Sequence, residues 1–190
     1  MRAPHPPALL AALLAAGIAS LPAFAQSNGQ TMSLAGKVIH VDDGDTLTML
    51  DAQQLKWVIR LTDIDAPESG HGTRRPGQPF AGKAAALLKS LALGKQATAT
   101  CYDIDNRHTR IRYVCRVFVD GTDTNMAMLD AGLAMAYRQQ PRYVRDQASY
   151  QHEEAARAKH LGIWSLPAPV PPWEWRKACW TQGRCEGAGD

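Results

Sequence analysis

Two short segments of the chain carry residue types that can bind a metal ion beside a phosphate group. The first reads Val-Asp-Asp-Gly-Asp-Thr over residues 41–46, and the second reads Arg-Leu-Thr-Asp-Ile-Asp-Ala-Pro-Glu over residues 60–68. Asp45 and Asp65 offer hard carboxylate oxygens, which suit Ca²⁺ and suit softer metals poorly. Arg60 carries a guanidinium that matches two phosphate oxygens at once and stays charged.

The order and spacing of these residues resemble the D-G-D-T and R-L-x-x-x-D-x-P-E signatures of the staphylococcal nuclease family. Gly132-Leu133-Ala134 and the run Leu161 to Ser165 also resemble that family, so the likeness spans roughly Leu34 to Ser165. It implies an OB-type barrel and a Ca²⁺-dependent phosphodiesterase of the micrococcal-nuclease type, acting on DNA and RNA as endonuclease and exonuclease. It also implies products with a 3′-phosphate, because the attack would expel the 5′ oxygen.

The resemblance assigns a role to each residue of the two segments. Asp45 and Asp65 would be the metal-binding carboxylates, and the backbone carbonyl of Ala66 would be a third ligand. Asp43 would orient water or backbone around the ion. Glu68 would be the general base that activates a water molecule for in-line attack.

A second arginine would join Arg60 in stabilising the charge of the five-coordinate transition state. The family reads D-x-Y-G-R where this chain reads Asn-Arg-His-Thr-Arg over residues 106–110. Arg110 fits when this loop is aligned without a gap, whereas Arg112 fits when counted back from Asp120-Gly121. Residues two apart in a strand share a face, so the spacing leaves both open, and we favour Arg110.

Arg60 and Asp65 are five positions apart, which would place them on opposite faces of a regular strand. Both can face one site only if the strand ends or bulges between them. The stretch 64–67 is suited to such a break, because the residue before a proline is restricted and a loop begins there.

Three further residues are candidates for substrate contact. Arg74 and Arg75 lie in a long Pro/Gly-containing loop, residues 63–79, where they contact backbone phosphates or are simply solvated. Tyr137 is a candidate for stacking on a base, against the alternative that it packs in the protein.

An active enzyme is weighed against a catalytically silent, nuclease-like OB module that binds nucleic acid or a protein. A silent relative would be expected to lose its carboxylates, whereas this chain keeps Asp45, Asp65 and Glu68 together with Arg60. We therefore favour the enzyme. Little base specificity is expected, since the proposed contacts go to phosphate and metal.

The N-terminus has the features of a secretory signal peptide over residues 1–25. Arg2 precedes a short apolar run from Ala8 to Ser20, and Ala23-Phe24-Ala25 provides a cleavage site. The run is short for a membrane span, which disfavours an uncleaved anchor. We expect a secreted or periplasmic protein without a membrane anchor, with a flexible lead-in over residues 26–33.

The four cysteines, Cys101, Cys115, Cys179 and Cys185, form an even set in a chain that we expect to be exported. Export favours disulfides over free thiols, and the C-x-x-C spacing of zinc sites is absent. Of three possible pairings we favour Cys101 with Cys115 across a hairpin, and Cys179 with Cys185 around a small loop.

Apolar alternation and turn signals predict an α+β fold, a five-stranded OB-type barrel with about three helices. The expected strands are 34–41, 45–50, 55–61, 96–102 and 111–119, and the expected helices are 80–93, 125–131 and 143–160. One domain would span residues 34–166, followed by a Pro/Trp-rich extension over residues 167–190. The net charge of +3 excludes a strongly basic architectural DNA-binding protein. We expect a monomer.

Overall fold

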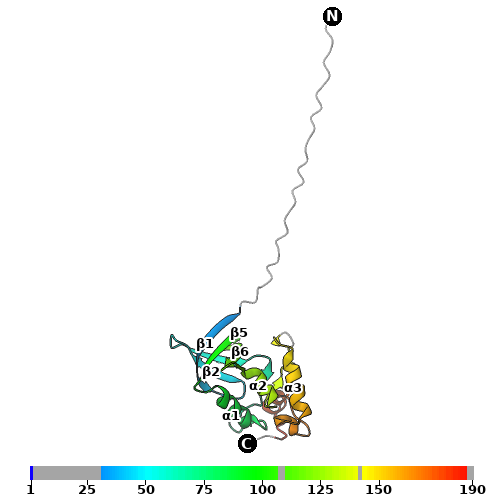
Figure 1. The fold of residues 1–190 in the computed structure, drawn as a ribbon. Coiled ribbons are helices and arrows are strands. Elements are labelled where there is room, and N and C mark those ends of the chain that lie inside the picture. The colour runs from blue at the N-terminus through cyan, green and yellow to red at the C-terminus, as the bar shows by residue number, and fades with distance from the viewer. Residues whose placement is uncertain (2–30, 107–109, 141–142, 188–190) are drawn as a thin grey trace.

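The computed structural model describes Met1 and residues 31–106, 110–140 and 143–187, and in this part of the chain five strands close into a barrel (Figure 1). They are β1 (Met32–Val41), β2 (Thr46–Leu50), β3 (Lys56–Leu61), β5 (Gln96–Asp105) and β6 (Arg112–Val119). The sheet order is β3-β2-β1-β5-β6, and a parallel pairing of β3 with β6 closes the ring. The predicted α+β fold with an OB-type barrel is confirmed.

Strand β1 joins the two halves of the barrel. It pairs with β5 from Met32 to Lys37 and with β2 from Lys37 to Val41, with an irregularity between Val38 and His40. The strand begins two residues earlier than predicted, so the end of the expected lead-in is ordered. Apart from Met1, the predicted signal peptide lies outside the described residues.

Helices cover one side of the barrel. They are α1 (Ala81–Ala92), α2 (Thr124–Asp130), α3 (Ala148–Ala158) and the short α4 (Pro172–Trp175), with a 3₁₀ turn at Gly162–Ser165 and a π-helical turn at Arg176–Thr181. Three short strands complete the described elements: β4 (Ile64–Asp65), β7 (Thr122–Asp123) and β8 (Met135–Ala136). Helix α2 lies between the barrel and α3 (Figure 1). No helix among the described residues is both long enough and apolar enough to cross a membrane.

Helix α3 begins at Ala148, later than the predicted residue 143, because side chains hold the preceding segment in an irregular path. The backbone N–H of Arg145 donates to Asp63, and Asp146 accepts from Arg116. The other Asp146 oxygen accepts from the backbone N–H of Ala148, the first residue of the helix.

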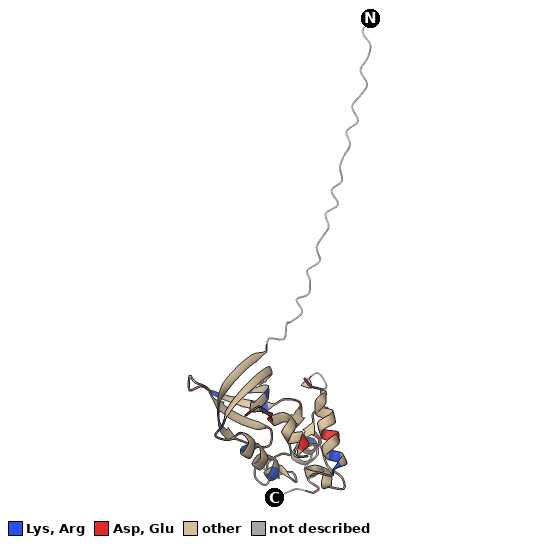
Figure 2. Cartoon of the chain, in the orientation of Figure 1, with Lys and Arg blue, Asp and Glu red and all other residues tan. Residues whose placement is uncertain are grey.

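The barrel interior is filled by apolar side chains from alternating strand positions, including Leu47, Ile59 and Val117, and by Leu88 of α1. Lys and Arg are interspersed with Asp and Glu along the chain (Figure 2), in keeping with the small net charge of +3. The main core therefore lies in the barrel and under α1 and α2, and a second, smaller cluster is formed by Met135, Ala156, Ile163 and Trp164.

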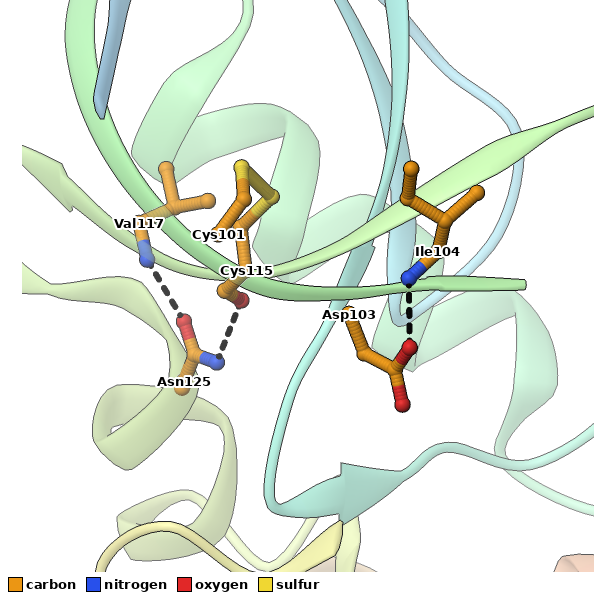
Figure 3. The surroundings of a disulfide bond; sticks show 6 residues. All are labelled: Cys101, Asp103, Ile104, Cys115, Val117 and Asn125. Carbon is orange, nitrogen blue, oxygen red and sulfur yellow. Dashed lines mark hydrogen bonds between the residues drawn. A yellow bond between two sulfur atoms is a disulfide. The ribbon is translucent and has the colours of Figure 1, made fainter. Parts of the chain in front are cut away.

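Both predicted disulfides are present. Cys101 and Cys115 face each other across β5 and β6, and Cys179 is bonded to Cys185. Beside the first disulfide, the side-chain amide of Asn125 donates to the carbonyl of Cys115 and accepts from the backbone N–H of Val117 (Figure 3). This amide fixes α2 to the barrel wall.

Candidate active site

A cavity of about 590 Å³ opens beside the ends of β3 and β6. Its walls come from the turn after β1, the loop after β3, the β5–β6 pair and the C-terminal extension. Residues that line it include Asp43, Asp45, Arg60, Ala66, Glu68, Arg75, Arg112, Tyr137 and Arg176. The cavity thus gathers most of the residues predicted to carry chemistry.

The strand break that the sequence demands between Arg60 and Asp65 is present. Strand β3 ends at Leu61, Asp63 adopts a left-handed φ of 67°, and Asp65 lies in the separate strand β4. The break falls at 62–63, slightly earlier than the expected 64–67. Asp tolerates this conformation better than most residues, and here its carboxylate accepts the backbone N–H of Arg145 at 2.5 Å. The chain therefore turns Asp65 back towards Arg60.

Arg60 joins the two candidate metal ligands directly. Its guanidinium donates to Oδ1 of Asp45 at 2.9 Å and to Oδ1 of Asp65 at 2.5 Å. Asp45 is 2% exposed and Asp65 is fully buried. Buried charges must be paired, so the guanidinium and the carboxylates hold one another in place.

Local contacts fix the turn that carries Asp45. Asp43 accepts the backbone N–H of Asp45 at 3.0 Å, and Asp45 Oδ2 accepts the N–H of Ala66 at 2.9 Å. A Cβ on Gly44 would lie 2.6 Å from that of Ala84 and 2.7 Å from that of Ala66. Only glycine allows the turn to pack this closely.

The pKa values of the two candidate metal ligands are shifted in opposite directions. Burial raises the pKa of Asp45 to about 7, and Asp43 and Asp65 add to the rise although Arg60 opposes it. For Asp65, burial also disfavours the charge, but Arg60 and Arg176 outweigh it and hold its pKa below the usual value.

The donor set fits a hard divalent cation held largely by water. Asp45 and Asp65 offer only carboxylate oxygens, the donors that a hard divalent cation prefers, and both contact the guanidinium of Arg60. No group of three or more His, Cys, Asp or Glu placed to hold a metal occurs among the described residues. The protein would thus supply two carboxylates, and the carbonyl of Ala66 is the candidate third ligand.

Glu68 lies in the loop after β4 and is partly buried. Its backbone exchanges two hydrogen bonds with Gln78, one to the Gln78 side chain at 3.2 Å and one from the Gln78 N–H at 2.8 Å. Burial raises the pKa of Glu68 to about 7, with Arg176 opposing the rise and Asp65 and Asp45 adding to it. A carboxylate with this pKa is suited to proton transfer near neutrality.

The structure brings Arg112, and not Arg110, into the cavity. Arg60 is paired with Val114 across β3 and β6, and Arg112 is two residues before Val114 on the same face. The Arg112 side chain is 19% exposed and donates to Asp105 at 2.7 Å. Arg110 precedes the strand, is 65% exposed and donates to Asp42 at 3.3 Å. The cavity geometry therefore favours Arg112 over Arg110 as the second arginine of the site.

Of the three candidate substrate-contact residues, two lie in the cavity wall and one lies outside it. Arg75 and Tyr137 line the cavity, whereas Arg74 is exposed and is not part of its wall. The Arg75 guanidinium lies 5.5 Å from the ring centre of Trp180, and the Tyr137 ring is 6.1 Å from that of Trp173. Both therefore border the cavity beside the C-terminal extension.

Residues 58–166 match the family model described as "Staphylococcal nuclease homologue". The chain belongs to the staphylococcal nuclease family. It is 35% identical over 167 residues to a micrococcal nuclease of Shigella flexneri, covering 85% of this chain and 87% of that protein. An uncharacterized endonuclease of Escherichia coli is 37% identical over 142 residues, covering 74% and 84%. Protein ParB of Escherichia coli is 33% identical over 175 residues, covering 88% and 89%.

This staphylococcal nuclease homologue has one further arginine in its site, which the sequence analysis missed. Arg176 donates to Oδ2 of Asp65 at 2.7 Å, to Oδ1 of Asp65 at 3.2 Å, and to Glu68. It lies in the C-terminal extension, beyond the segment that the family model matches. The extension packs against the rest of the domain, and its Trp175 is buried. The sequence signal for Arg176 was its position within a run that is rich in tryptophan.

Proposed function

We propose that this chain is an exported, Ca²⁺-dependent phosphodiesterase that hydrolyses DNA and RNA with low base specificity. The observation that carries the proposal is the double contact of Arg60 with Asp45 and Asp65. Arg60 and Asp45 line the cavity together with Glu68 and Arg112, whereas Asp65 is fully buried and reaches the site through its contact with Arg60. Family membership and relatives named micrococcal nuclease and endonuclease support the same reaction.

A cation held by Asp45, Asp65 and the carbonyl of Ala66 would supply Lewis-acid activation of the phosphate. These residues are preorganised for it, because Ala66 and Asp43 already fix the carboxylate and backbone of Asp45. Asp43 would also orient water at the edge of the site.

Glu68 is the general base of the proposed reaction. Its carboxylate takes a proton from water, and the resulting hydroxide attacks phosphorus in line with the 5′ oxygen. The bond from phosphorus to the 5′ oxygen breaks, and this oxygen takes a proton from solvent and leaves as a 5′-hydroxyl. The products carry a 3′-phosphate. The raised pKa of about 7 makes Glu68 a stronger base than an ordinary glutamate.

Arg60 and Arg112 stabilise the negative charge that develops on the phosphoryl oxygens. Arg60 is fixed by its two carboxylate partners, and Arg112 by Asp105. Removing one preorganised donor of this kind costs about a hundredfold to a thousandfold in rate. Arg75 and Tyr137 extend the surface available to the rest of the nucleic-acid strand.

The proposal also includes the cellular compartment and the oligomeric state of the protein. The two disulfides suit an oxidising compartment, secreted or periplasmic, reached through the signal peptide of residues 1–25. The mature protein is proposed to be a monomer without a membrane anchor. The alternative, a catalytically silent OB module, does not explain why Arg60 contacts both Asp45 and Asp65 beside Glu68 and Arg112.

Digestion of plasmid DNA and single-stranded RNA by the mature protein tests the function. We expect cleavage of both with Ca²⁺ and its loss with a chelator. Binding of either substrate without chelator-sensitive cleavage would support the silent module instead.

A further inference from the structure

The C-terminal extension places a cation of the protein itself on the carboxylates proposed to hold the metal. Arg176 contacts both oxygens of Asp65, at 2.7 and 3.2 Å, and one oxygen of Glu68. Its side chain is 32% exposed, while that of Asp65 is fully buried. The guanidinium therefore binds Asp65 bidentately, and all of its hydrogen bonds here are charge-assisted.

Arg176 is held in this position from several sides. The indole N–H groups of Trp175 and Trp180 both donate to the carbonyl of Pro76, at 3.4 and 3.1 Å. The side chain of Gln78, which also binds the backbone of Glu68, donates to the carbonyl of Val170 at 2.5 Å. The extension is thus fastened to the same loop that carries Glu68.

A disulfide closes the loop of residues 179–185, which begins three positions after Arg176. Cys179, which is 1% exposed, is bonded to Cys185, and it lies within the π-helical turn Arg176–Thr181. Cross-linking reduces the conformations open to a short terminal segment. Arg176 therefore lies in a turn whose second half is anchored by the disulfide.

Two arginines occupy most of the hydrogen-bonding capacity of Asp65. Arg60 and Arg176 donate to Oδ1, and Arg176 also donates to Oδ2. A carboxylate offers about four lone-pair sites in all, so one remains. A divalent cation binding to Asp65 must share these oxygens with the guanidinium groups and is repelled by their positive charge.

We propose that Arg176 is a built-in competitor of the divalent cation, which sets the concentration at which the metal site fills. The inference rests on the proposed function, because it takes Asp65 as a cation ligand. Without Arg176, Asp65 would keep Arg60 as a partner and would offer the cation more free lone pairs and less repulsion.

The test is calorimetric titration of Ca²⁺ into the full mature protein, with its disulfides intact and without substrate. We expect Arg176→Met to bind Ca²⁺ about tenfold more tightly than the wild type, or more, because a charge-assisted hydrogen bond to the ligand is removed. Lys177→Met is the matched control. It removes the same charge from the next, exposed residue, and it should bind like the wild type. Arg176→Lys keeps the charge without the two-pronged contact, and it should bind Ca²⁺ more tightly by a smaller factor.

Unchanged or weaker binding by Arg176→Met, with Ca²⁺ still bound by the wild type, would overturn the competition and leave the proposed function intact. An equal gain in Arg176→Met and Lys177→Met would also overturn it, since general charge would then explain the effect. Absence of Ca²⁺ binding by every form would overturn the metal site, and with it both proposals. If Arg176→Met does not fold, Arg176→Lys is judged by the same criteria.

Discussion

Arg176 and Glu68 lie 108 positions apart in the chain and meet in a hydrogen bond from the guanidinium to the carboxylate. The proposed base of the site is therefore held by a residue from the C-terminal extension. Burial still raises the pKa of Glu68 to about 7 against the opposing effect of Arg176. The pair joins the loop after β4 to the end of the chain and makes the extension part of the active-site wall.

Glu68→Gln should lower the cleavage rate by about a hundredfold to ten-thousandfold, because the amide cannot accept the proton of the attacking water. The substitution keeps the size of the side chain, so the circular dichroism spectrum should be unchanged. Glu154→Gln, at an exposed position of α3, is the matched control. A wild-type rate in Glu68→Gln would remove Glu68 from the mechanism.

Arg112→Ala should lower the initial rate by about a hundredfold to a thousandfold, as expected for a preorganised donor to the transition state. Arg110→Ala should leave the rate within a few-fold of the wild type, because its side chain is 65% exposed and lies outside the cavity wall. Thermal unfolding of both variants separates lost catalysis from lost folding. The opposite ranking would return the catalytic role to Arg110.

The cation-free protein should lose stability as the pH rises from about 4 to about 7. Asp45 and Glu68 have ordinary pKa values of 3.8 and 4.5, and burial raises both to about 7 in the folded state. Between these values the folded chain binds more protons than the unfolded chain, so deprotonation favours unfolding. The lowered pKa of Asp65 affects stability only below this window.

Calcium should therefore raise the unfolding temperature more at about pH 8 than at about pH 5, since it favours the ionised carboxylates. Melts followed by circular dichroism, with Ca²⁺ or with a chelator, measure the difference. An equal rise at both pH values would contradict the assignment of these groups.

Replacing both Cys101 and Cys115 by alanine should lower the free energy of unfolding by about 3 kcal/mol, as the loop-closure entropy of a loop of this length suggests. The two residues are 14 positions apart and are direct cross-strand partners. Urea unfolding of the double variant gives the value. Stability equal to that of the wild type would show that Asn125 and the strand pairing hold this wall unaided.

The barrel and the first half of the site followed from the sequence because their determinants are local. The alternation of apolar and polar residues indicated the strands, and Asp45, Arg60 and Asp65 lie in short segments with distinctive spacing. The need for a break between Arg60 and Asp65 followed from the two-residue period of a strand, and it is met at Asp63.

The second half of the site depends on the register of the strand pairing and on tertiary packing. Arg110 and Arg112 are two positions apart, so both would lie on the same face of a strand. Only the pairing of Arg60 with Val114 shows which one reaches the cavity. Arg176 is brought to Asp65 by the packing of Trp175 and Trp180 on Pro76, about a hundred positions earlier. No local pattern carries that information.

The ends of the products offer the most direct test of the proposed reaction. A 5′-labelled oligodeoxynucleotide is incubated with the mature protein and Ca²⁺, and the fragments are then treated with an enzyme that removes 3′-phosphates. We predict fragments whose mobility shifts after this treatment, and no fragments when a chelator replaces Ca²⁺. Fragments that already end in a 3′-hydroxyl, or cleavage that continues in the chelator, would contradict Ca²⁺-dependent attack with departure of the 5′ oxygen.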